Sequence, residues 1–158
     1  MIYEHEIPTG SKLYFGPSAK CKRELEHVAS ELLYEAGFEE IVTPFFSYHQ
    51  HQSIDEKELL RFSDEKNNIV SLRADSTMDA VRLITKRMGR STNHAKWFYI
   101  QPVFRYPSHE VHQIGAELIG EENLSISIAT SVALFERLNV KPLLHVSNIR
   151  IPQLLSHM

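Results

Sequence analysis

The residues of this sequence best suited to chemistry lie on one face of a predicted β-hairpin. Two runs rich in β-branched and aromatic residues, within 97–120, flank the turn-forming sequence Tyr-Pro-Ser-His at 106–109. Because side chains alternate along a strand, one face carries a guanidinium, two amides and a carboxylate around a glycine: Arg105, Gln101, Gln113, Glu117 and Gly115. The opposite face is apolar.

This polar face has two interpretations. Antiparallel sheets commonly keep one face on the core and the other in water, so the polar row is compatible with a solvated surface. Glycine, however, weakens a strand and often marks a place where a ligand or another backbone comes close. Gly115 at the centre of the row therefore favours a binding site, and both interpretations stay open.

Asp75 and Thr77 lie at the predicted N-terminus of a helix. Ser76, followed by Asp79 three residues later, resembles a capping box in which aspartate replaces glutamate. Plain capping accounts for either Asp75 or Thr77 alone. The residues themselves do not decide between a structural role and a ligand contact.

Metal and nucleic-acid chemistry are not expected. The nine histidines include the pairs His49/His51 and His109/His112, but neither pair has a cysteine or carboxylate partner at usual zinc spacing. We therefore expect no metal site and no cofactor. The formal net charge is −3 and no block of basic residues stands out, so composition gives no case for nucleic-acid binding.

Length and composition indicate a single α+β domain covering residues 1–158. The apolar runs are far below membrane-spanning length, and the N-terminal residues lack the basic start and apolar centre of a signal peptide. The single Cys21 cannot form an internal disulfide, which agrees with a reducing compartment. We expect a cytoplasmic protein without membrane association.

Other elements surround the polar hairpin. Apolar residues recur at helical spacing from Pro17 to Gly37, a residue suited to end a helix in the left-handed conformation. A short strand over 38–44 stops at Pro44, and the phenylalanines at 45–46 are more simply core residues than part of a dimer surface. Further elements are a hairpin with strands at 60–63 and 69–72, helices at 76–88, 127–138 and 148–155, and a strand at 142–146.

Taken together, these pieces resemble the catalytic core of class II aminoacyl-tRNA synthetases, most closely the histidyl branch, from about Pro8 to the C-terminus. The sequence GFEEIVTP at 37–44, with the preceding helix, is similar to motif 1, which forms the dimer interface of that family. The resemblance implies an antiparallel sheet flanked by helices. It also implies a homodimer with interface positions at Phe38, Ile41 and Pro44.

Three further segments carry the resemblance into a ligand site. SLRADST at 71–77 is similar to the LR-P-[DE]-x-T element, whose acid and threonine hold the ammonium group of substrate histidine. VFRY at 103–106 and HQIGAELIG at 112–120 are similar to the arms of motif 2, whose arginine contacts the ATP α-phosphate and whose glutamine and glutamate contact histidine. The resemblance therefore implies a histidine site at Asp75, Thr77, Gln113 and Glu117, with Arg105 as the residual motif 2 arginine.

The departures from the family pattern concern ATP. In histidyl-tRNA synthetases an arginine-rich loop separates the two arms of motif 2, whereas only residues 106–110 intervene here. LRAD replaces the usual LRP, and no segment similar to motif 3 follows, so the implied core stops before motif 3. Amino-acid activation depends on charge stabilisation at the phosphates, and the loss of these cations predicts a protein that is not an enzyme.

Within the same branch, the regulatory subunits of ATP phosphoribosyltransferase form a family of paralogues without tRNA charging. The resemblance to them implies a subunit that partners a short catalytic subunit in the first step of histidine biosynthesis and takes part in feedback by free histidine. Two alternatives remain. One is a fragment or degenerate paralogue of histidyl-tRNA synthetase, and the other is a stand-alone dimeric protein that binds histidine or another protein.

Overall fold

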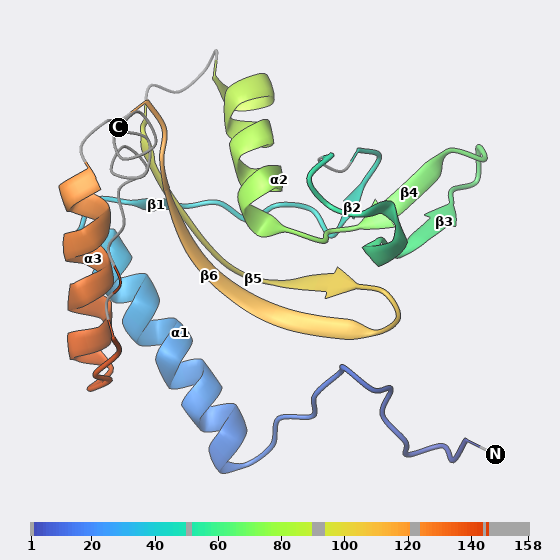
Figure 1. The fold of residues 1–158 in the computed structure, drawn as a ribbon, viewed down its shortest axis with the longest axis horizontal. Coiled ribbons are helices and arrows are strands. Elements are labelled where there is room, and N and C mark those ends of the chain that lie inside the picture. Colours follow the sequence, from blue (N-terminus) through green and yellow to red (C-terminus); the bar gives the residue numbers. More distant parts are fainter. Residues whose placement is uncertain (1, 50–51, 90–93, 121–123, 144, 146–158) are drawn as a thin grey trace, which may run out of the picture.

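The computed structural model in Figure 1 describes residues 2–49, 52–89, 94–120, 124–143 and 145. In chain order its elements are α1 (Pro17–Glu35), β1 (Glu39–Glu40), β2 (Phe46–Ser47), β3 (Arg61–Ser63), β4 (Ile69–Leu72), α2 (Ser76–Leu83), β5 (Lys96–Arg105), β6 (His109–Leu118) and α3 (Leu124–Arg137). A 3₁₀ turn at Glu56–Glu58 precedes β3, and a π-helical turn at Ile84–Met88 extends α2. The predicted α+β class is confirmed.

A long antiparallel hairpin forms the centre of the fold. β5 and β6 pair over their full lengths, from Lys96 opposite Leu118 to the turn at 106–108. β1 pairs with β5 in parallel, which gives the sheet order β1-β5-β6. The predicted hairpin and its shared polar face are confirmed, since Gln101 lies directly opposite Gln113.

Helices cover both faces of this hairpin. Figure 1 shows α1 and α3 together on one side and α2 on the other. The buried cluster on the α1 side consists of Leu32, Leu33, Phe38 and Phe98. The buried cluster on the α2 side consists of Ile41, Ala80, Ile84, Trp97 and Tyr99. The α2 side is the polar face predicted from alternation, so its interpretation as an open solvated surface is wrong, and Gln101 on that face is only 4% exposed.

A second, smaller sheet lies at the end of the molecule away from α1 and α3 (Figure 1), with strand order β2-β4-β3. Its β3–β4 hairpin confirms the predicted one, and Asp64 closes the turn by accepting hydrogen bonds from the N–H groups of Lys66 and Asn68. The expectation that Phe45 and Phe46 are ordinary core residues is wrong. Their side chains are 50% and 59% exposed.

The start and end of α1 follow local sequence signals. α1 begins at Pro17, and Gly37 follows it with a φ of +80°. The predicted strand over 142–146 is wrong at its described residues 142, 143 and 145, which have no regular structure, and the predicted helix over 148–155 lies outside the described residues. No helix among the described ranges is both long and apolar enough to span a membrane.

Candidate functional site

The amino end of α2 lies over the polar face of the β5–β6 hairpin and brings predicted ligand residues together. The backbone N–H of Ser76 donates to Oε1 of Gln113 at 3.1 Å. Thr77 Oγ1 lies 2.5 Å from the hydroxyl of Tyr99, which donates to Oε1 of Glu117 at 3.2 Å. Thr77 on α2 thus meets Gln113 and Glu117, which lie on the distant segment β6.

Asp75 joins them as the N-cap of α2. Its side chain accepts a hydrogen bond from the backbone N–H of Met78 at 2.9 Å. The capping box predicted from Ser76 and Asp79 is wrong, because Ser76 Oγ is buried without a hydrogen-bond partner among the described atoms and Asp79 pairs with Arg82. We call Asp75, Thr77, Tyr99, Gln113 and Glu117 the polar cluster.

Tyr99 is the member of the polar cluster that sequence reasoning missed. Its side chain is 3% exposed, and its ring lies against Gly115, the residue directly opposite on β6. A Cβ on Gly115 would lie 2.2 Å from the Tyr99 hydroxyl oxygen and 2.3 Å from its Cζ. Gly115 therefore makes room for an aromatic ring of this chain. The observed pairing of Arg105 with His109 places Tyr99 opposite Gly115, whereas the predicted turn at 106–109 would place Tyr99 opposite Ala116. The available signal for Tyr99 was alternation, which puts it on the same face of the strand as Gln101 and Arg105.

Burial and charge set the protonation of the polar cluster. Burial raises the pKa of Glu117, and the charge of Asp75 adds to the rise, while hydrogen bonds from Thr77 and Tyr99 oppose it. Burial also raises the pKa of Tyr99 to about 12, so its hydroxyl stays protonated at neutral pH. Asp75 and Glu117 are two interacting carboxyl groups, and a bound cation would relieve their repulsion.

The raised pKa predicts how Glu117→Gln changes stability with pH. A carboxyl whose pKa is higher in the folded state than in the unfolded state stabilises the fold below its unfolded pKa, and this contribution is lost as pH rises through the folded pKa. Because glutamine does not ionise, the free energy of unfolding of Glu117→Gln relative to wild type should increase from about pH 4 to pH 7. Urea unfolding without ligand measures this difference, with Glu65→Gln in the exposed β3–β4 turn as control. A difference independent of pH would contradict the raised pKa.

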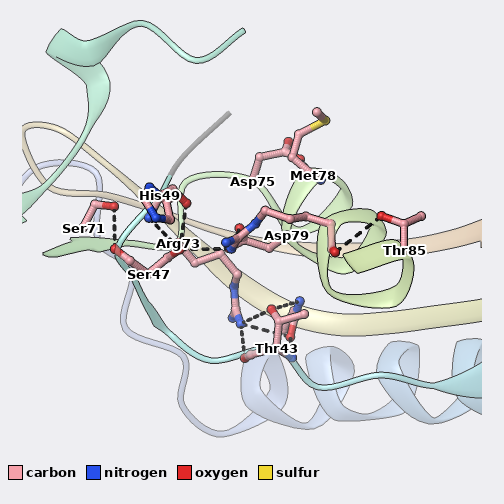
Figure 2. A network of polar contacts seen from close by, with 11 residues as sticks. Thr43, Ser47, His49, Ser71, Arg73, Asp75, Met78, Asp79 and Thr85 are labelled. Atoms are coloured by element: carbon pink, nitrogen blue, oxygen red, sulfur yellow. Dashed lines mark hydrogen bonds and ion pairs between the residues drawn. The ribbon is translucent and has the colours of Figure 1, made fainter. Parts of the chain in front are cut away.

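Arg73, to which the sequence reasoning gave no role, binds together the segments that position the polar cluster. Its side chain is fully buried, and Nη1 donates to the carbonyl oxygen of Thr43 at 2.7 Å and to Gln101 Oε1 at 3.0 Å. Nε and Nη2 both donate to the carbonyl oxygen of Pro102, at 3.0 and 2.6 Å. Figure 2 shows the Arg73 side chain reaching Thr43, with dashed lines at its contacts with that residue.

The backbone of Arg73 makes further bridges just before Asp75. Its N–H donates to the carbonyl of Phe45 at 2.7 Å, and its carbonyl accepts from the N–H of Phe104 at 2.8 Å. Burial lowers the pKa of the guanidinium, whereas the charge of Asp79 raises it. Arg73 therefore fixes the loop that leads into α2 by joining it to the segment before β2 and to β5.

Arg105 lies beyond the polar cluster, near the hairpin turn. Its Nε donates to the carbonyl oxygen of Ala74 at 3.3 Å, and its Nη1 pairs with Glu58 Oε2 at 3.2 Å. Arg105, Glu58, His109 and Gln113 contribute to the lining of a pocket of about 520 Å³. Because Gln113 also belongs to the polar cluster, the two sites adjoin. Within the described residues, no group of three or more His, Cys, Asp or Glu side chains is arranged to hold a metal ion.

The three predicted interface positions divide between core and surface. Phe38 and Ile41 are buried in the chain's own core, so the structure does not present their side chains to another molecule. Pro44 is exposed, and so are the apolar side chains nearby at Val42 and Phe45. The exposed apolar surface therefore lies at 42–46, just beyond the buried positions.

Comparison with known proteins connects this arrangement to a family. The family model for histidyl-tRNA synthetase matches residues 14–155. The chain belongs to the histidyl-tRNA synthetase family. It is 55% identical to the ATP phosphoribosyltransferase regulatory subunit of Wolinella succinogenes, over 98% of this chain and 54% of that protein. It is 50% identical to the corresponding subunit of Helicobacter hepaticus, over 96% of this chain and 55% of that protein.

Solved structures confirm the predicted class II synthetase-like fold of this histidyl-tRNA synthetase family member. An ATP phosphoribosyltransferase regulatory subunit/histidyl-tRNA synthetase from Bacillus halodurans matches it with a TM-score of 0.77 at 24% identity, over 89% of this chain and 40% of that one. The chain thus spans about half the length of the curated relatives it matches.

Proposed function

We propose that this chain belongs to a non-catalytic regulatory subunit of ATP phosphoribosyltransferase. In this role it supports the first step of histidine biosynthesis in the cytoplasm and mediates feedback by histidine. The observation that carries the proposal is the convergence of Thr77, Gln113 and Glu117 beneath the Asp75 cap, in a chain 55% identical to one regulatory subunit.

The polar cluster suits the ammonium group of an amino acid. An ammonium offers three donors and no acceptor. Thr77 and Glu117 supply oxygen acceptors, and Asp75 adds a second carboxylate at the same end of α2. Burial raises the pKa of Glu117. A bound cation would act in the opposite direction and favour the ionised carboxylate.

The pocket beside the polar cluster supports a regulatory rather than an activating role. Activation of an amino acid needs cations that stabilise charge on the phosphates. Here the charge of Arg105 is offset by its ion pair with Glu58. The turn between β5 and β6 spans only residues 106–108, none of which is a lysine or arginine, so it adds no cation to the pocket.

Co-purification and an activity assay with a short-form catalytic subunit test the proposal. We expect a stable complex, a higher rate of ATP phosphoribosyltransferase than that of the catalytic subunit alone, and inhibition by histidine. Glu117→Gln should weaken that inhibition, whereas Glu65→Gln should not. No complex and no change in rate would overturn the proposal.

The exposed segment 42–46 supports assembly as a homodimer. Contiguous exposed apolar side chains mark interaction surfaces, and Val42, Phe45 and Phe46 are all at least half exposed. Light scattering at micromolar concentration should give the mass of a dimer. Phe46→Asp should shift it to a monomer because a carboxylate would be buried at the interface, while Leu124→Asp, at an exposed position on α3, should not. A monomeric wild type would contradict the dimer.

An active histidyl-tRNA synthetase is the second candidate, since its family model matches the chain and the predicted histidine residues come together. Histidine-dependent pyrophosphate exchange separates the two. We expect no exchange, because Glu58 already pairs with Arg105. Exchange above background would favour the synthetase.

A further inference from the structure

The smaller sheet holds a cavity that shares no lining residue with the polar cluster or with the pocket beside Arg105. Strand register places Arg61 opposite Ser71, and Ile69 lies two residues before Ser71, so these three side chains share one face of the β3–β4 hairpin. They line the cavity together with residues of the segment 52–59. Its volume of about 440 Å³ is in the range of pockets that hold small molecules.

Part of the cavity wall is apolar. Ile54 and Leu59 line the cavity, are buried, and belong with Ala74 to a small core cluster. Ile69 lines the same space, but its side chain is 64% exposed. A ligand with an apolar portion would remove the surface of Ile69 from water, which is favourable. The wall therefore favours a ligand that is partly apolar.

Two opposite charges also line the cavity. Arg61 Nη1 lies 3.4 Å from Glu56 Oε2, and the side chains of Arg61 and Glu56 are 39% and 81% exposed. An exposed ion pair of this kind contributes little to stability, so a ligand can replace it at low cost. A guanidinium has five N–H donors and a carboxylate has two acceptor oxygens. A ligand whose own two charges lie close together can therefore bind both side chains at once.

Ser71 adds a buried hydroxyl to the cavity wall. Its side chain is 4% exposed, and its Oγ donates to the carbonyl oxygen of Ser47 at 3.2 Å, as Figure 2 shows. Because the hydroxyl hydrogen is used in that bond, the lone pairs of Oγ remain as acceptors. Ser71 and Glu56 thus both accept hydrogen bonds, whereas Arg61 only donates them. The lining combines acceptors for an ammonium, donors for a carboxylate and an apolar wall.

We propose that this cavity binds a zwitterionic α-amino acid with an apolar side chain. Arg61 binds the carboxylate of the ligand, Glu56 and Ser71 bind its ammonium, and Ile69 contacts its side chain. Glu56 repels a ligand that has only a carboxylate, and Arg61 repels a ligand that has only an ammonium, so the site requires both charges. The inference goes beyond the proposed function, because the cavity is separate from the polar cluster.

Titration of the ¹⁵N-labelled chain with L-leucine, followed by NMR of the backbone amides, tests this site. We expect saturable shifts at the amides of Ile69 and Ser71. Three related compounds each lack one of the required groups: 4-methylpentanoate has no ammonium, 3-methylbutylamine has no carboxylate, and glycine has no apolar side chain. Each should bind on the order of fivefold more weakly than leucine, as expected for the loss of one contact near the surface.

Single substitutions locate the binding groups. Arg61→Met and Glu56→Gln should each weaken leucine binding on the order of fivefold while the circular dichroism spectrum stays that of wild type. Lys57→Met, in the same exposed turn as Glu56, and Glu65→Gln, in the β3–β4 turn, are the matched controls and should bind leucine as wild type does.

Glu117→Gln separates this cavity from the polar cluster and should leave the shifts at Ile69 and Ser71 unchanged. Three results would overturn the proposal. They are no saturable shift at those amides up to millimolar leucine, equal affinities for leucine and 4-methylpentanoate, and leucine binding that Arg61→Met leaves intact.

Discussion

Replacing Arg73 by methionine should destabilise the protein by about 3 kcal/mol or more, out of the roughly 5–15 kcal/mol that hold a typical domain together. The carbonyl oxygens of Thr43 and Pro102 would lose their donors inside the protein. Each buried acceptor left without a partner costs about 1–3 kcal/mol. Methionine is, like arginine, long and unbranched, so the loss of stability reports mainly the missing hydrogen bonds. Urea unfolding followed by circular dichroism measures it.

Arg61→Met is the control, since Arg61 lies on the exposed strand β3 and pairs with Glu56 at 3.4 Å. An exposed ion pair contributes about 1 kcal/mol or less, so this variant should stay near wild type. The loss of stability in Arg73→Lys should fall between the losses in Arg61→Met and Arg73→Met, because lysine keeps a donor but cannot make the forked contacts of a guanidinium. Similar losses for Arg73→Met and Arg61→Met would show that Arg73 does not hold the loop before α2.

Gly115→Ala should damage both stability and ligand binding. The added Cβ would lie 2.2 Å from the Tyr99 hydroxyl, so the ring must move out of a buried cluster in which it is 3% exposed. Overpacking of this kind costs about 1–3 kcal/mol. The displaced ring would also break the contacts to Thr77 and Glu117, so histidine binding should weaken by more than tenfold. Thermal unfolding and calorimetry measure the two effects.

Ala116→Ser provides the control for this substitution. Residue 116 is exposed, and its side chain points to the opposite face of β6, so the change should stay within about 0.5 kcal/mol. Tyr99→Leu should partly rescue Gly115→Ala by removing the ring atoms that clash, which a double-mutant cycle would report as strong coupling. Independent effects of the two changes would contradict the steric account.

Alternation along β5 and β6 predicted the shared polar face because side-chain direction in a strand depends only on odd or even position. Gln113 and Glu117 therefore lie where the pattern put them. Local chemistry also marked the amino end of α2, although the cap is Asp75 and not Ser76. Patterns of this kind succeed where the residues that make the deciding contacts are close together in the sequence.

The remaining features depend on contacts between distant segments. Nothing beside Arg73 in sequence shows that Thr43 and Pro102 will surround it. Phe45 and Phe46 are apolar, and their exposure depends on where β2 lies relative to the main hairpin. The meeting of the α2 residues with β6 was implied by the family resemblance and not by periodicity, since periodicity assigns faces and does not pair elements.

Calorimetric titration with L-histidine tests most directly the central claim that the polar cluster is a histidine site. Wild type should show saturable binding at one site per chain. Glu117→Gln keeps the size of the side chain but removes its charge and should weaken binding by tenfold or more, while Glu65→Gln should bind as wild type does. No saturable heat from wild type up to millimolar histidine, or equal affinities for wild type and Glu117→Gln, would contradict the claim.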